Sequence, residues 1–268
     1  MIVDWIYNNP TWIWAPIVVG LFVGAACGGL WLFDRLVKVE VRRAHNELAG
    51  FAIAVISVTY AVLLAFIAIA TWESFTEAGV IVDREADYAG SIYRDTQGLP
   101  NDMGSAIRQD IDDYVKIVVE QEWPEQEAGQ TPEQGWEPLR KVQVAIVKLQ
   151  PANLGEAVIQ AELLRTLNEL YRARSSRLTA VSGHIPPVIW WIIVLSGALT
   201  TAYTYLFGFH DFRMHLVMTA SVAASLALVI VLIIALDWPF RGDVSISPEA
   251  FVKAQQSWNN LSYTKVAP

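Results

Sequence analysis

The stretch YAVLLAFIAIATWESFTEAGVIVDREADYAGSIYRD, residues Tyr60–Asp95, decides the fold because it joins an uncharged segment suited to lipid to an acidic segment suited to water. No proline occurs in it, and its two glycines only weaken a helix. Apolar residues recur at intervals of three and four beyond Trp72, at Phe75, Ala78, Val82, Ala86, Ala89 and Tyr93. The sequence therefore predicts one helix of about 45 residues, from Phe51 to Asp95, that leaves the membrane and continues into an outer bundle.

Four uncharged apolar segments are long enough to span a bilayer, which takes roughly 20 residues. They lie at residues 11–33, 51–72, 187–207 and 216–236. Charged residues make up 17% of the chain, against about 25% in soluble domains. The sequence therefore predicts an all-α membrane protein with four transmembrane helices and a helical bundle inserted between the second and third spans.

The basic residues of the short loops suggest an orientation. Arg35, Lys38, Arg42 and Arg43 follow the first span, whereas no Lys or Arg precedes it. Short basic loops stay in the cytoplasm. We therefore expect both chain ends and the segment 73–184 to lie outside the cytoplasm, although the C-terminal tail also holds three basic residues.

The segment 73–184 is acidic and has the pattern of helices. It holds 19 acidic and 11 basic residues, a difference that equals the net charge of the whole chain, −8. Nucleic acid is therefore not expected as a partner, because phosphate binding needs a basic patch. Apolar spacing predicts helices at about 103–123, before Pro151 and at about 155–180. Pro186 and Pro187 predict a break before the third span.

The tail, residues 237–268, carries a second amphipathic pattern. Phe251, Trp258 and Leu261 predict a short helix lying on the membrane surface.

Catalytic and metal-binding signals are sparse. The four histidines lie in different loops or span ends without ligand spacing. The chain has no Gly-rich phosphate loop and no Ser-His-Asp signature. The four spans contain no Asp, Glu, Lys, Arg or His, whereas coupled transporters bury such residues in the membrane. We expect no enzyme activity, no metal site and no cofactor.

Several separated motifs occur in order along nearly the whole chain. They are RRAHNELAGF at 42–51, YAVLLAF at 60–66, WESF at 72–75, EQEWP at 120–124, an RxxR pair at 174–177 ahead of PPVIW at 186–190, and LDWPFRGDVSISPEAF at 236–251. Together they resemble the bestrophin-like family of bacterial membrane proteins, a distant relative of the bestrophins. The resemblance implies four spans in a bacterial inner membrane, with the soluble part between the second and third. Bestrophins are oligomeric anion channels lined by their second span.

One face of the second span suits a pore lining. Small, hydroxylated and apolar residues recur on it at steps of three and four: Ser57, Tyr60, Leu64, Ala68 and Thr71. Such a face lines a pore that gates by dewetting. The alternative is ordinary helix packing, in which Ser and Thr bond their own backbone.

Two further patterns flank this face. Glu73 and Glu77 lie one turn apart, and symmetry would repeat them as acidic rings at a pore mouth, which attract cations. The alternative is a solvated helix exit. Gly20, Gly24 and Gly28 form a small-residue ridge on the first span, typical of close helix packing within or between subunits. The alternative is that these glycines face lipid.

The sequence thus favours a passive channel formed by a homo-oligomer in a lipid bilayer, lined by the second span and conducting inorganic ions. The acidic mouth predicts cation preference. The second span also offers Tyr60 and Phe66 in place of the phenylalanine run of the bestrophin neck, which argues against anion selectivity. The alternative is a non-conducting membrane scaffold or sensor whose helical bundle binds a partner or ligand.

Overall fold

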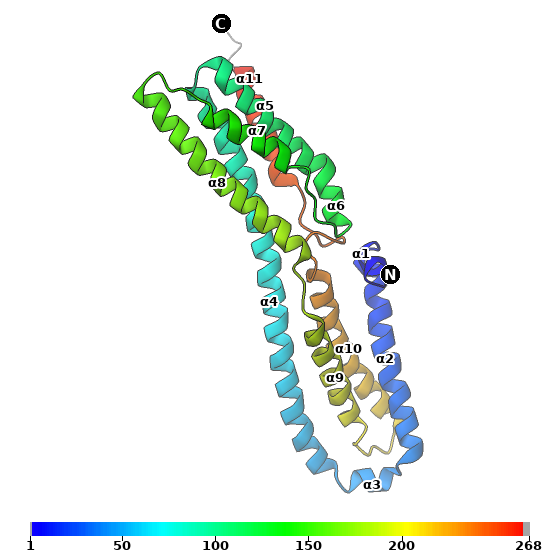
Figure 1. Cartoon of the computed structure of the whole chain (residues 1–268). Coiled ribbons are helices and arrows are strands. Elements are labelled where there is room, and N and C mark those ends of the chain that lie inside the picture. Colours follow the sequence, from blue (N-terminus) through cyan, green and yellow to red (C-terminus); the bar gives the residue numbers. More distant parts are fainter. Residues whose placement is uncertain (1, 265–268) are drawn as a thin grey trace. The chain divides into compact units, whose positions relative to one another are not determined.

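The described residues, 2–264 of this computed structural model, form helices and no strands (Figure 1). Four helices are long and apolar enough to cross a membrane: α2, α4, α9 and α10. The predicted all-α fold with four candidate spans is therefore confirmed, and the chain is an integral membrane protein. The helices are α1 (Ile2–Tyr7), α2 (Thr11–Leu36), α3 (Val39–Arg43), α4 (Asn46–Asp95), α5 (Asn101–Ile117), α6 (Trp123–Glu127), α7 (Trp136–Val147), α8 (Leu154–Ser182), α9 (Pro187–Thr204), α10 (Phe212–Leu236) and α11 (Glu249–Thr264), with a 3-10 turn η1 (Thr96–Gly98) and a π turn η2 (Val118–Glu122).

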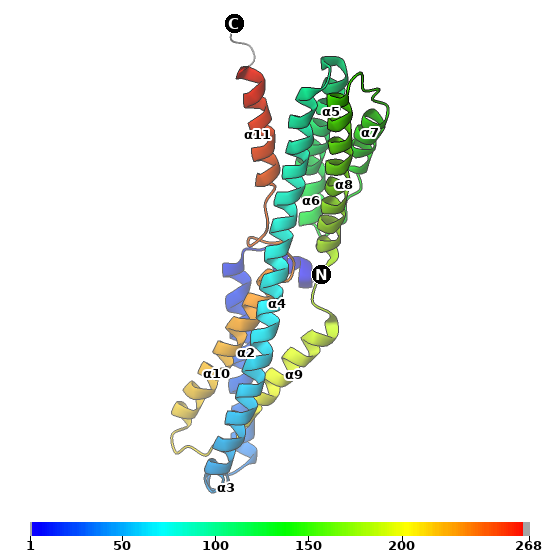
Figure 2. The same cartoon turned by 90° about the vertical axis from the view of Figure 1, so that its left-hand side faces the viewer.

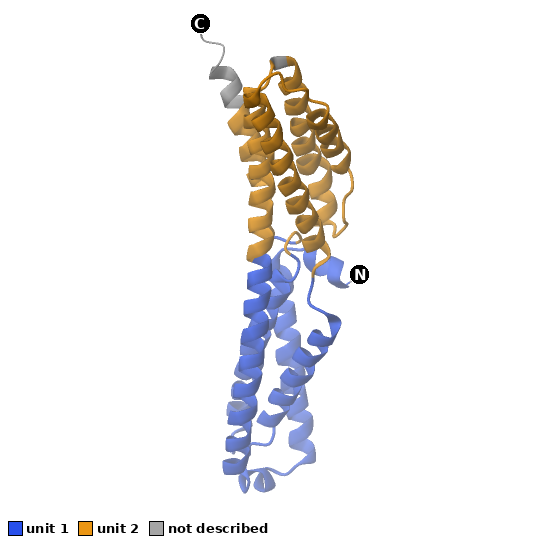
Figure 3. Cartoon of the chain, turned by 60° about the vertical axis from the view of Figure 1, so that its left-hand side comes forward, with its two compact units in different colours: residues 1–75, 184–238, 242–244 blue, residues 76–183, 239–241, 245–268 orange. Residues whose placement is uncertain are grey.

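Helix α4 runs through 50 residues without a break. The prediction of one continuous helix across Trp72 is confirmed, and the helix begins earlier than predicted, at Asn46. The chain divides into two compact units, and α4 contributes to both (Figure 3). Unit 1 comprises residues 1–75, 184–238 and 242–244, and unit 2 comprises the rest.

In unit 1, α2 lies along α10 (Figure 2), and α9 packs against both of these helices. A small apolar core joins Tyr60 and Leu64 of α4 to Ile193 of α9 and to Ile230 and Ile233 of α10. Most of the apolar surface of these helices stays exposed in the isolated chain. Such surface needs lipid or another protein chain to cover it.

The boundary between α8 and α9 follows the prolines. Helix α8 ends at Ser182, and Pro187 begins α9 with Pro186 as its N-cap. Proline suits a first helical position because the N–H that it lacks has no partner there. The predicted break before the third span is therefore confirmed.

Unit 2 is a helical bundle with a continuous apolar core. The stripe predicted for α4 is buried at Ala78, Val82, Ala86 and Ala89. Helices α5, α7 and α8 supply most of the remaining core side chains, among them Ile111, Tyr114, Leu139, Val142, Leu167 and Leu170.

The C-terminal helix α11 belongs to this bundle. Phe251 and Trp258 are buried in the core of unit 2, and Trp258 stacks on Tyr93 with ring centroids 4.7 Å apart. The prediction that this helix lies on the membrane surface is wrong, because the side chains that would enter lipid pack against protein. The side chain of Leu261 lies outside the described residues.

A π turn, η2, connects α5 to α6 and has a local cause in the sequence. Pro124 follows it, and a proline can neither donate a hydrogen bond to the preceding turn nor fit its carbonyl closely. The wider π turn accommodates the ring without ending the helix. The turn ends at Glu122, whose side chain is buried.

Candidate functional site

The face of α4 predicted to line a pore packs largely against the chain's own helices. Tyr60 is buried, and its hydroxyl donates to the carbonyl oxygen of Ile193 at 2.9 Å. Leu64 and Thr71 are also buried, and the hydroxyl of Thr71 donates to the carbonyl of Ile67 within α4. Ser57 and Ala68 are partly exposed at the edges of this face. The lining role stays a prediction, and for Tyr60 and Leu64 it requires α9 to move away.

The opposite face of α4 is an exposed apolar stripe. Few residues in the apolar part of α4 are buried within the chain. The stripe recurs at steps of three and four along the span, which places it on one side of the helix: Phe51, Val55, Val58, Val62, Phe66 and Ile69. We call these six residues the α4 stripe. Sequence alone did not reveal which face of the span the chain would leave uncovered.

Glu73 and Glu77 are both exposed on α4 just beyond the apolar residues. Glu77 forms an ion pair with Arg84, with N and O atoms 3.6 Å apart and both side chains 59% exposed. Such a solvated ion pair contributes little to stability. Arg84 therefore reduces the local negative charge but does not fix the position of the Glu77 side chain. The role of the two glutamates at a pore mouth stays a prediction.

The glycine ridge of α2 faces away from the rest of the chain. A Cβ added at Gly20, Gly24 or Gly28 would meet no atom within 4 Å. The ridge therefore packs against no other helix in the described part of this chain, and its packing between subunits stays a prediction. Gly29 is the closely packed glycine, because a Cβ there would lie 2.6 Å from the hydroxyl of Tyr205.

The most elaborate polar cluster of the described residues is buried in unit 2. Arg174 of α8 binds Glu122 through two hydrogen bonds, Nη1 to Oε2 at 2.8 Å and Nη2 to Oε1 at 2.6 Å. The backbone N–H of Gly135 donates to the same carboxylate at 2.6 Å. Paired donors of this kind match a carboxylate geometrically and fix its orientation.

Arg177, one turn further along α8, joins this pair to α4. Its Nε and Nη2 donate to Glu85 at 2.7 and 3.0 Å, its Nη1 donates to Gln126 at 2.7 Å, and its Nη2 also donates to Glu122 at 2.9 Å. The hydroxyl of Tyr114 donates to Glu85. The four charged side chains are wholly buried. We call Glu85, Glu122, Arg174 and Arg177 the buried charge cluster.

Two carboxylates and two guanidinium groups balance each other's charge in this cluster. Burial alone would raise the pKa of Glu122, but the hydrogen bonds and charge of Arg174, together with Arg177, hold that pKa below its usual value. Burial raises the pKa of Tyr114 well above its ordinary value, and the negative charge of Glu85 adds to this. The phenol therefore stays protonated and remains a donor.

The sequence contained a signal for the buried charge cluster that pattern reading did not use. Glu122 lies in EQEWP and the two arginines form the RxxR pair, but these motifs served only to support the resemblance. Both arginines continue the buried stripe of α8, which holds Leu163, Leu167 and Leu170. Charged residues in phase with an apolar stripe indicate buried ion pairs. Glu85, which lies between Asp83 and Asp87 in the sequence, is buried as well.

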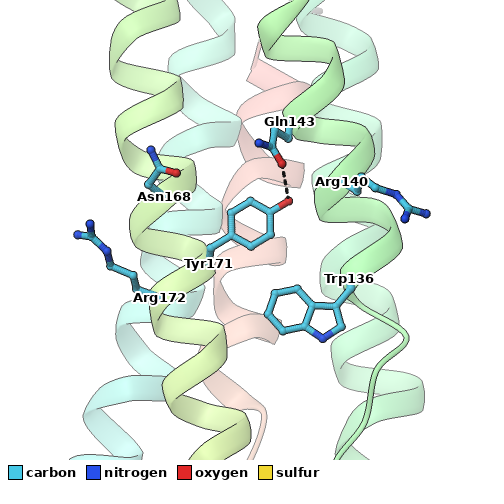
Figure 4. A pocket seen from close by; sticks show the side chains of 6 residues that line it. All are labelled: Trp136, Arg140, Gln143, Asn168, Tyr171 and Arg172. Atoms are coloured by element: carbon cyan, nitrogen blue, oxygen red, sulfur yellow. Dashed lines mark hydrogen bonds between the residues drawn. The ribbon is translucent and has the colours of Figure 1, made fainter.

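A hollow on the surface of unit 2 lies between α7 and α8 (Figure 4). It has a volume of about 540 Å³ and is lined by Trp136, Arg140, Gln143, Asn168, Tyr171 and Arg172. The rings of Trp136 and Tyr171 stack at 6.0 Å, and the tyrosine hydroxyl donates to Gln143 at 3.2 Å. The guanidinium carbon of Arg174 lies 4.5 Å from the ring centroid of Trp136, so the hollow shares a wall with the buried charge cluster.

Metal chemistry finds no support in the described part of the chain. No group of three or more His, Cys, Asp or Glu side chains there is arranged to hold a metal ion. The two carboxylates of the buried charge cluster, Glu85 and Glu122, are each paired with an arginine.

This architecture matches a known protein family and several solved structures. A family model for the Bestrophin-like domain matches residues 20–251. The fold is similar to solved structures of a bacterial bestrophin homologue from Klebsiella pneumoniae. A single-residue variant of that protein has 12% sequence identity and a TM-score of 0.68, with 90% of this chain and 98% of that chain covered. The structure solved by Zn-SAD phasing has 15% identity and a TM-score of 0.62, with 96% and 99% covered.

At these identities the structural likeness shows the fold alone. A search of the curated proteins found no match. Because the family model spans most of the sequence, it carries the assignment. The chain belongs to the family of Bestrophin-like domain proteins.

Proposed function

We propose that this protein forms a homo-oligomeric, passive ion channel whose pore is lined by α4 and prefers cations. The observation that carries the proposal is the α4 stripe, an exposed apolar face along an unbroken helix that the chain leaves without a protein partner among the described residues. Membership of the Bestrophin-like family supports the channel class. One chain with four spanning helices cannot enclose an aqueous path, so the channel requires several copies.

The two faces of α4 offer alternative linings. The predicted lining, from Ser57 to Thr71, packs mainly on α9 and α10, whereas the α4 stripe is uncovered. An apolar stripe around a symmetry axis would act as a hydrophobic constriction that opens by wetting. Cation preference comes from Glu73 and Glu77, whose charges would form rings at one end of the pore.

Reversal potentials in planar bilayers under a potassium chloride gradient test conduction and selectivity. We expect reversal near the potassium potential, and a shift toward zero in Glu73→Gln/Glu77→Gln. Glu133→Gln, which changes an exposed loop residue of unit 2, is the matched control and should leave the potential unchanged. Reversal near the chloride potential in the wild type would contradict the cation preference and retain the channel.

Cysteine accessibility decides between the two linings. Cys27 is the one cysteine of the sequence, so Cys27→Ser gives a clean background. Single cysteines at Val62 and Phe66 test the α4 stripe, and cysteines at Ser57 and Ala68 test the predicted face. A water-soluble thiol reagent should change the conductance only where the cysteine lines the pore.

The hollow between α7 and α8 favours a second candidate function, a ligand-binding sensor. Its donor-rich lining and its contact with Arg174 through Trp136 suit a small polar ligand. A sensor without conduction would give silent bilayers across varied pH, calcium and membrane tension. In that case Trp136→Ala should change ligand-dependent thermal stability, whereas exposed Glu133→Gln should not.

We place the protein in a bacterial inner membrane, with unit 2 outside the cytoplasm, on the basic residues of the loop that follows α2. A single cysteine at Glu133 tests this in whole cells. A membrane-impermeant maleimide should label it without cell lysis, whereas labelling only after lysis would reverse the orientation.

A further inference from the structure

An apolar crevice opens at one end of the spanning helices of unit 1. It has a volume of about 340 Å³ and lies where α2, α3, α4 and α9 come together. Its walls include Phe33, Val37, Leu48, Ala52 and Leu206. The short α3 connects two spans, so the crevice lies at the level where lipid acyl chains meet the lipid headgroups.

Arg42 and His45 give the crevice a polar end. Arg42 is only 4% exposed, and its Nη2 is paired with Asp34 while its Nη1 donates to the carbonyl of Tyr205 at 3.3 Å. Its Nε is buried without a hydrogen-bond partner among the described residues. An unpaired buried donor in a residue that lines a crevice indicates an acceptor supplied by water or by a ligand.

His45 adds a second polar group at this end of the crevice. Its Nδ1 lies 2.9 Å from the carbonyl oxygen of Val41, so that nitrogen carries the proton and donates it, and Nε2 of the neutral ring is an acceptor. The side chain is exposed. An exposed imidazole and a buried guanidinium thus border one apolar crevice.

We propose that this crevice binds a glycerophospholipid, with an acyl chain along the apolar wall and a phosphate oxygen accepting a hydrogen bond from Arg42. A phospholipid combines a hydrocarbon chain with a phosphodiester. The apolar crevice at membrane level suits the chain, and the unpaired guanidinium N–H suits the phosphate. Guanidinium groups match phosphate oxygens in geometry and in charge.

The phosphate, more than the headgroup charge, carries the recognition. The exposed charges around the crevice are three basic and two acidic residues, Arg35, Lys38, Arg43, Glu40 and Glu47. This small positive surplus gives only a weak preference for anionic headgroups. A lipid without phosphate would leave the Arg42 Nε unpaired.

The test measures lipid binding to the full-length, delipidated protein in detergent by native mass spectrometry. The probes are dioleoyl phosphatidylglycerol, dioleoylglycerol, which lacks the phosphate, and inorganic phosphate, which lacks the chains. Displacing even two methylene groups from the crevice weakens binding about tenfold. We expect Ala52→Phe, which fills the slot, to reduce phosphatidylglycerol binding by at least that factor.

Ala54→Phe is the matched control, because Ala54 is exposed on the same helix and does not border the crevice. It should bind phosphatidylglycerol as the wild type does, and both proteins should bind dioleoylglycerol far more weakly.

Three results would overturn the proposal. Equal phosphatidylglycerol binding by Ala52→Phe and Ala54→Phe would show that the crevice is not the site. Equal binding of the two lipids, or equal stabilisation by inorganic phosphate, would remove either the phosphate or the chain from the recognition. Loss of subunit association in Ala52→Phe with full lipid binding would assign the crevice to a second copy of this chain.

Discussion

Replacing Arg177 by methionine should destabilise unit 2 strongly. Arg177 donates four hydrogen bonds of 2.7 to 3.0 Å inside a wholly buried cluster. The Arg177→Met variant keeps an apolar stem of similar length but leaves the buried carboxyl group of Glu85 with Tyr114 as its remaining hydrogen-bond partner. Removing one member of a buried pair costs about 3–5 kcal/mol, because the other charge stays in a low-dielectric interior.

The assay is thermal unfolding of the full-length protein in detergent, followed by far-ultraviolet circular dichroism. At about 2–4 °C per kcal/mol for a chain of this size, we expect the transition of unit 2 to fall by roughly 6–20 °C. Limited proteolysis should cut α8 faster in the variant, since local opening exposes its backbone.

Arg172→Met is the matched control on the same helix. Arg172 pairs with Glu169 at 2.8 Å, but its side chain is 74% exposed, so its loss should cost about 0–1 kcal/mol. The double variant Glu85→Gln/Arg177→Met should recover part of the lost stability, because it removes the uncompensated carboxylate. Equal melting of Arg177→Met and Arg172→Met would refute the reasoning that burial makes this cluster strong.

Three further changes test other parts of the structure. Arg174 lowers the pKa of Glu122 in the folded state. The ionised Glu122 therefore stabilises the fold above its unfolded pKa of about 4.3, and this stabilisation is lost as pH falls below that value. The melting temperature of the wild type should drop between pH 6 and pH 3.5 more steeply than that of Glu122→Gln. Gly135→Ala places a Cβ 2.6 Å from Nη1 of Arg174, so it should cost about 1–3 kcal/mol in the same thermal assay, and an unchanged transition would contradict the close packing. Tyr60→Phe removes the hydrogen bond to Ile193 and should lower the free energy of unfolding by about 0.5–1.5 kcal/mol, measured against the wild type in identical detergent. An unchanged or higher stability would show that the bond contributes nothing.

The sequence by itself determined the elements whose signals are local. Runs of uncharged apolar residues identified the four spans, since lipid demands about 20 such residues in a row. Pro187 identified the start of α9. The absence of a breaker between Phe51 and Asp95 identified the long helix α4. Each of these depends on neighbouring residues alone.

Only the tertiary structure decided which face of each helix is covered. The periodicity of α4 named a face at Tyr60 and Leu64, but their burial depends on Ile193, which is 133 residues from Tyr60 in the chain. The exposure of the glycines in α2 likewise depends on where α10 packs.

The buried charge cluster shows the same division. Sequence places Glu85 in an acidic run, where charged residues are usually solvated. Its burial follows from Arg177, 92 residues away in the chain. A charge can leave water only where an opposite charge and hydrogen bonds meet it. That meeting is set by the packing of α4 against α8, so local sequence reasoning could identify the helices but not the cluster between them.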